Sequence, residues 1–533
     1  MAERDPAIAR LWLLTAVRLA GVGLAVSGVV VAGRAAGATA TIATLLDAAA
    51  DPDLGMRAAE DGRSEVDGDS LTTRAVVPAL AVPGRTTRVP GSALRAFRIG
   101  LDVPARVAVS RRPYAAAGVT DLTSANRPHD AKGIVMYSRG GRLHNHPVVQ
   151  ASHILAWASS YRNGGGVAYR DQAVKHGERM LSYAVRSRGA LYFPYRFDFP
   201  LHGRKDLTLT APWYSAMAQG EALSAFVALY EITGQPRWKA AADATFVSFL
   251  QPKAAKVPWT VQVDSSGLLW FEEYAGTHTD RAFNGHNFAL FGVYDYWWLT
   301  RDSRARAVFL GGLQATRVHL AGIRVPGRTS RYCLAHDVHS DSYHGIHISQ
   351  LLTLYRLTGS RDLVRAADRL QADAPRDYLG GTGYLAGVQH TVVQRRADGR
   401  VASVRTVTLP RSQQVRVGRR SWVAGRPGVW LRIDSGTLKG SWVAELPRRS
   451  FVVGVRDTLA YEPARPVTLA KGAQTGYRLD ASGRWVAVRT VRLTRAAAAR
   501  AGGRLTRDGA VYVTMASGPM QGLSVPIGRV TLL

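Results

Sequence analysis

Two stretches, "LYEITGQPRWKAAAD" (229–243) and "LYRLTGSRDLVRAAD" (354–368), share Leu-Tyr, then Thr-Gly, then a closing Ala-Ala-Asp at matching offsets. Each has the pattern of a helix that ends at a Thr-Gly turn, followed at once by the start of a second helix. Degraded copies surround Tyr161 and Tyr296, and the tyrosines from Tyr161 to Tyr355 recur at intervals of 69, 66 and 59 residues. We therefore predict a helical hairpin that is repeated about four times.

A repeated pair of helices cannot bury its apolar face alone, so neighbouring pairs must stack in a solenoid or close into a ring. We expect an all-α, (α/α) toroid-like domain, or an open section of one, over residues 131–380. By analogy, folds of this kind carry carbohydrate clefts at one end of their inner helices.

The last part of the chain changes to short alternating strands with glycine turns, and it also repeats itself. The stretch "VRTVTLPR" (404–411) returns as "VRTVRLTR" (488–495), and "VWLRIDSGTLKGSWV" (429–443) is answered by "VYVTMASGPMQGLSV" (511–525). We predict two small all-β modules, SH3-like or barrel, over residues 383–533. The protein is then multidomain.

The N-terminus has the features of an export signal. Three arginines precede an apolar run over residues 19–33, and Ala36-Gly37-Ala38 is a small-x-small cleavage pattern. Residues 1–38 are expected to be a signal peptide or, read from Leu11, an uncleaved membrane anchor. We expect a secreted or membrane-anchored, extracytoplasmic protein, in which residues 39–130 form a partly disordered linker and lead-in.

The chain of 533 residues has 69 Lys and Arg against 39 Asp and Glu, a formal charge of +30 that attracts polyanions. The arginines are scattered, and no RNA-binding or zinc-finger pattern accompanies them, so we expect no nucleic-acid partner. Anionic lipid surfaces and acidic polysaccharides both remain candidates for a polyanion partner or substrate, and a cell-wall or glycan surface is a candidate partner of the β modules. The sequence leaves the oligomeric state open, with a homodimer as one option.

Three segments of the helical region carry polar and aromatic clusters. "PWYSAMAQGEALSAF" (212–226) places Ser215 and Gln219 four residues apart on one helix face. "LLWFEEYAGTHTDRAFNGHNFALFGVYDYW" (268–297) begins with an acidic pair and a tyrosine. "RYCLAHDVHSDSYHGIH" (331–347) has two tyrosines eleven residues apart. Taken singly, each segment is typical of a structural role, such as a tyrosine that bridges core and solvent.

Taken together and in this order, the segments resemble the C-terminal catalytic domain of the D-glucuronyl C5-epimerases, which act on heparosan-type polysaccharides. The resemblance rests on "WYSAMAQGEALSAF", on "FEEY" followed by "FNG" and "LFGVYD", and on "DSYHGIHISQL" before "LTGS". It spans roughly residues 190–370. It implies an isomerase in which Tyr274, Tyr332 and Tyr343 do the proton work, with Glu273 as the acidic neighbour.

Inversion at C5 of a uronate removes a proton next to a carboxylate and returns one from the opposite face, so two acid/base groups are needed. A tyrosine, with a free pKa near 10, needs nearby cations or hydrogen-bond donors to act as a base. The polar residues assigned to substrate binding are Ser215, Gln219, Asn284, Arg331, His344 and His347.

We expect no cofactor and no metal. His344 and His347 have no third ligand at a diagnostic spacing. Cys333 is the only cysteine, which excludes an intramolecular disulfide and a thiolate cluster, and we assign it no role.

Two other functions remain open. A polysaccharide lyase begins with the same C5 deprotonation and then expels the C4 substituent. A non-catalytic glycan-binding or cell-wall-binding protein would depend on the β modules alone.

Overall fold

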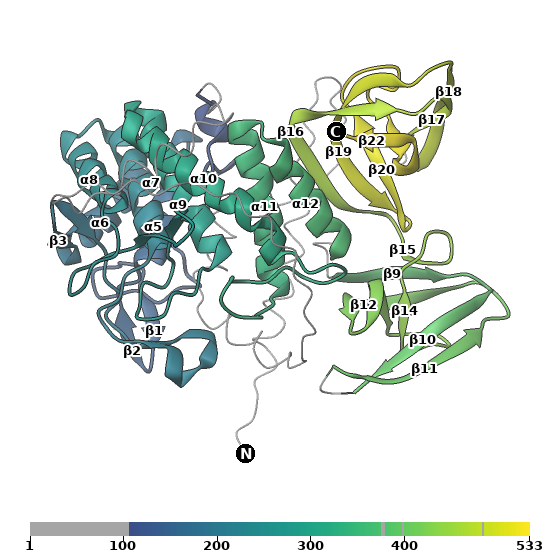
Figure 1. Cartoon of the computed structure of the whole chain (residues 1–533), viewed down its shortest axis with the longest axis horizontal. Helices are drawn as coiled ribbons and strands as arrows, with labels where there is room; N and C mark the ends of the chain where they lie inside the picture. The colour runs from purple at the N-terminus through teal and green to yellow at the C-terminus, as the bar shows by residue number, and fades with distance from the viewer. Residues whose placement is uncertain (1–105, 375–378, 397–398, 482–483) are drawn as a thin grey trace. The chain divides into compact units, whose positions relative to one another are not determined.

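The computed structural model describes residues 106–374, 379–396, 399–481 and 484–533 (Figure 1). The expected signal or anchor (1–38) and the lead-in as far as residue 105 lie outside these residues. Within the described part of the chain, no helix is long and apolar enough to cross a membrane.

The chain divides into two compact units. Its helical unit contains the described residues up to 324 together with 331–346. The second unit contains residues 325–330 and 347–533, so the last helical pair, apart from residues 341–346 of α11, groups with the β region.

The predicted hairpin repeat is confirmed (Figure 1). Its helices, taken in pairs, are α5 (Pro147–Arg162) with α6 (Val167–Tyr183), α7 (Ala216–Thr233) with α8 (Pro236–Val247), α9 (Phe283–Thr300) with α10 (Ser303–Ile323), and α11 (Asp341–Thr358) with α12 (Arg361–Asp373). Each of the four repeated tyrosines lies near the end of the first helix of its pair.

The Thr-Gly turns end the first helices as expected. Gly234 and Gly359 have φ of 68° and 69°, the left-handed conformation in which glycine is favoured. Their backbone N–H groups donate to the carbonyl oxygens of Tyr230 and Tyr355 at 2.8 and 2.7 Å. Each short turn therefore satisfies a carbonyl at the helix end and starts the next helix at once.

In the helical unit, α7 packs between α5 and α9, and α6, α8 and α10 each pack against the first helix of their own pair. Helices α7 and α9 approach closely at Gly220 and Gly292. A Cβ atom at Gly292 would lie 2.1 Å from the carbonyl oxygen of Gly220. Because the short turns all lie at one end of the helix pairs, the long loops 184–215, 248–282 and 324–340 lie at the other end.

Small two-stranded sheets and 3-10 turns stiffen the long connections. They are β1 (Tyr137–Arg139) with β2 (Arg142–His144), β3 (Val185–Ser187) with β4 (Ala190–Tyr192), β5 (Phe199–Pro200) with β6 (Thr208–Leu209), β7 (Val261–Val263) with β8 (Leu269–Phe271), and the turns η3 (Val109–Arg111), η4 (Leu201–Gly203), η5 (Lys205–Leu207) and η6 (Ser248–Leu250).

The described part of the lead-in is attached to the helices by a buried ion network. Arg112 Nε donates to Asp295 Oδ1 of α9 at 2.8 Å, and Arg112 Nη1 donates to Glu231 Oε1 of α7 at 2.6 Å. Arg112 and Asp295 are 6% and 1% exposed. This segment is therefore part of the helical unit.

The β region consists of two seven-stranded antiparallel sheets. The first sheet contains β9 (Leu379–Leu385), β10 (Gln389–Arg395), β11 (Val401–Thr408), β12 (Gln413–Val423), β13 (Arg426–Ile433), β14 (Trp442–Ala444) and β15 (Ser450–Val452). The second contains β16 (Val455–Leu469), β17 (Gly472–Leu479), β18 (Trp485–Leu493), β19 (Ala497–Arg507), β20 (Ala510–Met515), β21 (Ser524–Pro526) and β22 (Val530–Leu532), with the turn η7 (Ile527–Arg529) before its last strand.

Both sheets have the same topology. Their strand orders are β11-β10-β14-β13-β12-β9-β15 and β18-β17-β21-β20-β19-β16-β22, so equivalent strands occupy equivalent places. The sequence echo 404–411 and 488–495 begins in β11 and β18, the third strand of each copy. The repeat of two β modules is present, whereas their expected SH3-like or barrel form is not confirmed.

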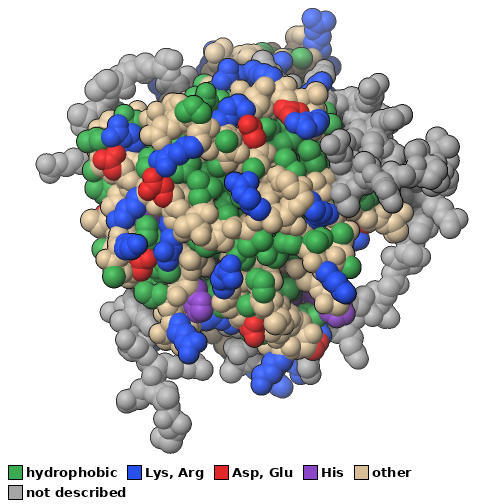
Figure 2. Space-filling view, turned by 90° about the vertical axis from the view of Figure 1, so that its left-hand side faces the viewer, with side chains coloured by type: hydrophobic (Ala, Val, Ile, Leu, Met, Phe, Trp, Pro, Cys, Tyr) green, Lys and Arg blue, Asp and Glu red, His purple; other side chains and the backbone are tan. Residues whose placement is uncertain are grey.

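Charged side chains are mixed on the surface. On the face shown in Figure 2, Lys and Arg are scattered among apolar and polar side chains, with fewer Asp and Glu. This spread matches the scattered arginines of the sequence.

Candidate active site

Three predicted tyrosines meet at the end of the helical unit that carries the long loops. Tyr274 follows β8, Tyr332 comes from loop 324–340, and Tyr343 lies in the first turn of α11. The hydroxyl oxygens of Tyr274 and Tyr332 are 2.8 Å apart. The ring of Tyr343 meets the ring of Tyr332 edge-on, with centroids 4.6 Å apart. All three are buried, at 8%, 2% and 2% exposure.

Glu273 joins the same cluster. The Tyr332 hydroxyl donates to Glu273 Oε1 at 3.4 Å. Burial raises the pKa of Glu273 to about 8, and the charge of Asp280 also raises it. Gly285, in the first turn of α9, leaves room for this carboxyl group, because a Cβ atom there would lie 2.2 Å from Glu273 Oε2. Glu273 is therefore mostly protonated at neutral pH.

Both phenols of the hydrogen-bonded pair are protonated as well. Burial, followed by the charge of Glu273, raises the pKa of Tyr274 and of Tyr332 well above 10. The three side chains thus form one hydrogen-bonded set whose oxygens can exchange a proton.

The adjacent Glu272 shapes the loop. Its Oε1 atom accepts from the backbone N–H groups of Tyr274 and Arg281 at 3.3 and 3.2 Å. Burial raises its pKa to about 8 as well. Of the acidic pair, Glu273 therefore faces the tyrosines and Glu272 supports the backbone.

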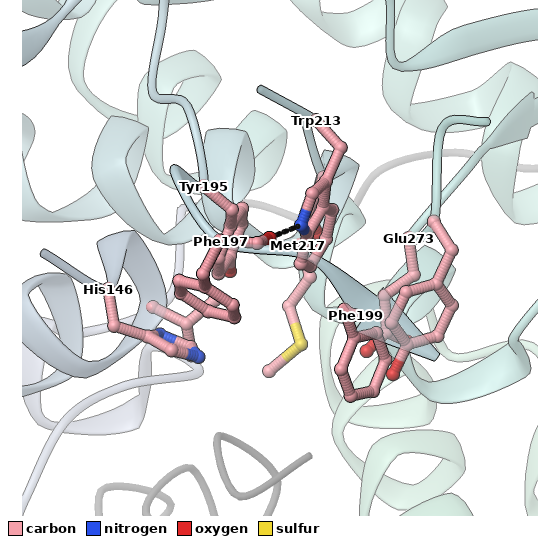
Figure 3. A pocket seen from close by; sticks show the side chains of 10 residues that line it. His146, Tyr195, Phe197, Phe199, Trp213, Met217 and Glu273 are labelled. Atoms are coloured by element: carbon pink, nitrogen blue, oxygen red, sulfur yellow. Dashed lines mark hydrogen bonds between the residues drawn. The ribbon is translucent and has the colours of Figure 1, made fainter. Parts of the chain in front are cut away.

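A small cavity lies against this cluster (Figure 3). It is lined by His146, Val148, Tyr195, Phe197, Phe199, Trp213, Ser215, Met217, Glu273 and Tyr274. The rings of Tyr195 and Trp213 stack at 3.9 Å, and Trp213 Nε1 donates to the carbonyl oxygen of Phe197 at 2.9 Å. Aromatic walls with a few polar groups are typical of small-ligand sites.

His146 lies on the opposite side of the cavity from Glu273 in Figure 3. It caps α5, and its Nδ1 atom accepts from the backbone N–H of Val149 at 3.3 Å. Burial lowers the pKa of His146 to about 3. The neutral ring that uses Nδ1 as an acceptor carries its proton on Nε2, so His146 offers a hydrogen-bond donor.

Ser215 and Gln219, predicted to share one face, have different environments. Ser215 caps α7, where its hydroxyl oxygen accepts from Ala218 N–H at 3.4 Å, and it lines the cavity. Gln219 does not line the cavity. Its Oε1 atom accepts from Phe193 N–H at 3.0 Å, and its Nε2 atom donates to Leu191 O at 2.7 Å and to Ser248 Oγ at 2.9 Å. In this structure the Gln219 side chain therefore joins the backbone at the end of β4 to the start of η6.

The other predicted binding residues are dispersed. Asn284 is buried in the first turn of α9, and His344 is buried beside Tyr343. Arg331 is partly exposed and pairs with Asp337 at 2.9 Å, so its charge is directed to its own loop. His347 belongs to the second unit, where its Nδ1 atom lies 2.9 Å from Ser330 Oγ.

Sequence reasoning missed most of the cavity wall and a group of metal-ligand side chains. Tyr195, Phe197 and Phe199 alternate along a single connection, "YRFDF", and this spacing is the one signal that could have indicated an aromatic wall. His146 carried no such signal. The side chains that could hold a metal are His202, Asp280, Cys333 and His336.

Several solved structures are similar to part of this chain, with low sequence identities and low TM-scores. A glycoside hydrolase family 76 mannosidase of Bacteroides thetaiotaomicron VPI-5482 is 15% identical with a TM-score of 0.28, covering 42% of this chain and 58% of its own. A family 76 α-mannanase of the same species is 14% identical with a TM-score of 0.34, covering 55% and 73%. The cellobiose 2-epimerase of Spirochaeta thermophila DSM 6192 is 15% identical with a TM-score of 0.32, covering 54% and 65%.

The present chain spans less than two thirds of the first of these proteins. The motifs around the tyrosine cluster lie inside a more specific match. Residues 189–372 match the family model described as the D-glucuronyl C5-epimerase C-terminus, which confirms the resemblance that the sequence motifs predicted.

Proposed function

We propose that this protein is a carbohydrate epimerase that inverts C5 of D-glucuronate residues to L-iduronate within a polysaccharide. The observation that carries the proposal is the hydrogen-bonded set of Tyr274, Tyr332 and Glu273 at the wall of an aromatic cavity. The family match over residues 189–372 supports the same reaction class. The formal charge of +30 suits an acidic polymer.

The reaction needs a proton acceptor, a proton donor and stabilisation of the charge that forms. The C5–H bond breaks, its electron pair moves into the adjacent carboxylate as an enolate, and a new C5–H bond forms on the opposite face. The sugar is neither oxidised nor reduced. A group whose pKa lies near the working pH serves such transfers best, and Glu273, with a pKa of about 8, meets this condition.

We assign the ionised form of Glu273 as the proton acceptor, with Tyr332 as its hydrogen-bond partner, and Tyr274 as the donor. Glu273 and Tyr274 both line the cavity, whereas Tyr332 contacts both of them. The Nε2–H group of His146, across the cavity, is placed to bind the uronate carboxylate or the enolate. The stacked pair of Tyr195 and Trp213 gives the cavity an aromatic wall against which a sugar can pack.

The test is incubation of heparosan and other glucuronate polymers in D₂O, followed by NMR at C5 and by size analysis. An epimerase introduces deuterium at C5, forms iduronate and leaves the chain length unchanged. A lyase shortens the polymer and creates an unsaturated end that absorbs in the ultraviolet. A glycan-binding protein without catalytic activity gives neither result, and either of the last two results contradicts the proposal.

The assigned roles are tested separately. If Tyr274 returns the proton, Tyr274→Phe should suppress iduronate formation more strongly than deuterium exchange into glucuronate. Glu273→Gln should suppress both equally, because it blocks the first step. If instead Glu273→Gln mainly suppresses iduronate formation and Tyr274→Phe suppresses both processes equally, the two roles are exchanged.

A further inference from the structure

A second polar cluster lies directly beside Tyr332 in the helical unit. His202 comes from the turn η4, Asp280 from the loop before α9, and Cys333 and His336 from loop 324–340. Each of the four residues offers one ligand atom, and these four atoms all lie within 4.8 Å of one another. These residues belong to three loops, and the fold brings them to a single point.

The distances around this point are short. Asp280 Oδ1 is 2.7 Å from His202 Nε2 and 2.8 Å from His336 Nδ1. Cys333 Sγ is 3.8 Å from the same His202 nitrogen and 3.6 Å from the His336 nitrogen. Both imidazoles and the thiol therefore direct ligand atoms at a common centre that also contains the carboxylate.

Hydrogen bonds within this buried cluster leave one carboxylate oxygen unsatisfied. Asp280 is 1% exposed, and its second oxygen, Oδ2, has no hydrogen-bond partner among the described residues. A buried carboxylate oxygen without a partner has lost its hydration without full compensation. His202 is also buried, and its φ of 54° places a non-glycine residue in the left-handed region.

We propose that these four side chains form a structural zinc site. Two imidazole nitrogens, one thiolate and one carboxylate oxygen are a donor set that Zn²⁺ accepts in tetrahedral geometry. With metal–ligand distances of 2.0–2.3 Å, tetrahedral ligands lie about 3.3–3.7 Å apart. The two sulfur–nitrogen distances are near this range. The two nitrogen–oxygen distances would open by about 0.5 Å as the metal replaces the shared protons.

The charges also agree with a zinc ion. A thiolate and a carboxylate together neutralise Zn²⁺, so the loaded site carries no net charge into the protein interior. Four protein ligands fill the coordination of the ion, which is the pattern of structural sites, whereas catalytic zinc keeps an open position for water. The proposal therefore assigns the metal no step in the reaction.

The site would brace the loop that positions Tyr332. Cys333 is its neighbour in sequence, and the ring of His202 packs edge-on against the Tyr332 ring with centroids 5.8 Å apart. The Tyr332 carbonyl oxygen accepts from Phe283 N–H at 3.0 Å, which joins the same loop to the start of α9. An effect of the metal on turnover is expected only if the proposed function is right. The binding of the metal is independent of that function.

The first test measures metal content in the full chain, purified without an affinity tag. Elemental analysis after dialysis should find about one zinc per chain in the wild type and in His278→Gln, an exposed histidine two residues from Asp280. Cys333→Ser and Asp280→Asn should lower the bound zinc at least tenfold. Wild-type protein with no zinc, or variants that keep it, would overturn the site.

A second test identifies the ligands. Cobalt(II) added to metal-free wild type should give the visible bands of a tetrahedral centre and a near-ultraviolet thiolate-to-cobalt band. Cys333→Ser should lose the thiolate band and bind cobalt more weakly. If Cys333→Ser fails to fold by circular dichroism, His336→Gln, at the more exposed edge of the cluster, takes its place, with weakened cobalt binding expected. A cobalt spectrum without the thiolate band in folded wild type contradicts the proposal, whatever the enzymatic activity.

Discussion

The hydroxyl oxygens of Tyr274 and Tyr332, 58 residues apart in the sequence, lie 2.8 Å apart in a buried hydrogen bond. Glu273 accepts from the second of these phenols. A pair of phenols beside a carboxyl group of raised pKa is an unusual feature for a scaffold, because each buried hydroxyl must find a partner. It is a suitable arrangement for moving one proton.

Removal of either phenol oxygen should disable this set. Tyr274→Phe and Tyr332→Phe are each expected to lower turnover by about two to four orders of magnitude, as is typical of lost acid/base groups. The family resemblance predicts the same for Tyr343→Phe. The measurement is the initial rate of iduronate formation. Tyr296→Phe is the matched control, because its hydroxyl donates to another carboxylate, Asp243, at 2.8 Å near the far end of α9. Unchanged rates in the first two variants would contradict the assignment.

The raised pKa of Glu273 predicts a pH dependence of stability. Its folded value is about 8 against an ordinary value of 4.5. Between about pH 4.5 and 8 the unfolded chain releases the proton that the folded protein keeps, so the free energy of unfolding falls as pH rises. Glu273→Gln removes this contribution. The variant should therefore gain stability relative to wild type between about pH 5 and 8 in denaturant titrations.

Glu178→Gln, an exposed residue that pairs with Arg237 at 2.9 Å, is the control for this experiment. It should follow the wild-type pH dependence. Parallel curves for wild type and Glu273→Gln would mean that Glu273 keeps an ordinary pKa.

Substitutions at two glycines of α9 distinguish an effect on catalysis from an effect on packing. In Gly285→Ala the new methyl group collides with Glu273, whereas in Gly292→Ala it collides with the backbone of Gly220 in α7. Both should lower stability by about 1–3 kcal/mol through overpacking. Gly285→Ala should in addition lower turnover per folded molecule at least tenfold. Equal specific activities of the two folded variants, measured beside their unfolding curves, would contradict a catalytic position for Glu273.

The ion network of the lead-in predicts a large stability effect away from the cavity. Arg112→Met leaves Asp295, which is 1% exposed, without its cation, and should lower the free energy of unfolding of the helical unit by about 3–5 kcal/mol. Arg170→Met, which breaks an exposed pair with Asp171, should have no measurable effect. Chemical unfolding monitored by tryptophan fluorescence makes the comparison. A small loss in Arg112→Met would mean that the lead-in is dispensable.

Local patterns made much of the fold predictable. The Thr-Gly turns located the helix ends because a left-handed glycine is required at that point, as Gly234 shows. The strand echo beginning at Val404 and Val488 identified the β repeat before its topology was visible. The tyrosine cluster was predictable through the family motifs, since spacing alone does not show that Tyr274 and Tyr332 meet.

Other features depend on contacts between distant loops and left little trace in the sequence. Gln219 was assigned to substrate because it shares a helix face with Ser215, but α7 is enclosed by neighbours, so its faces cannot be separated into core and solvent sides by pattern. The four side chains around Asp280 come from three loops, and a single cysteine gives no spacing signal for a metal site.

The most direct test of the central claim uses a glucuronate polymer labelled with deuterium at C5 and follows the release of the label into water. We predict that wild-type protein releases the label while the polymer keeps its length, and that folded Tyr332→Phe and Glu273→Gln release it at least a hundredfold more slowly. Failure of wild type to release label from any uronate polymer, or release accompanied by chain shortening, would contradict the account.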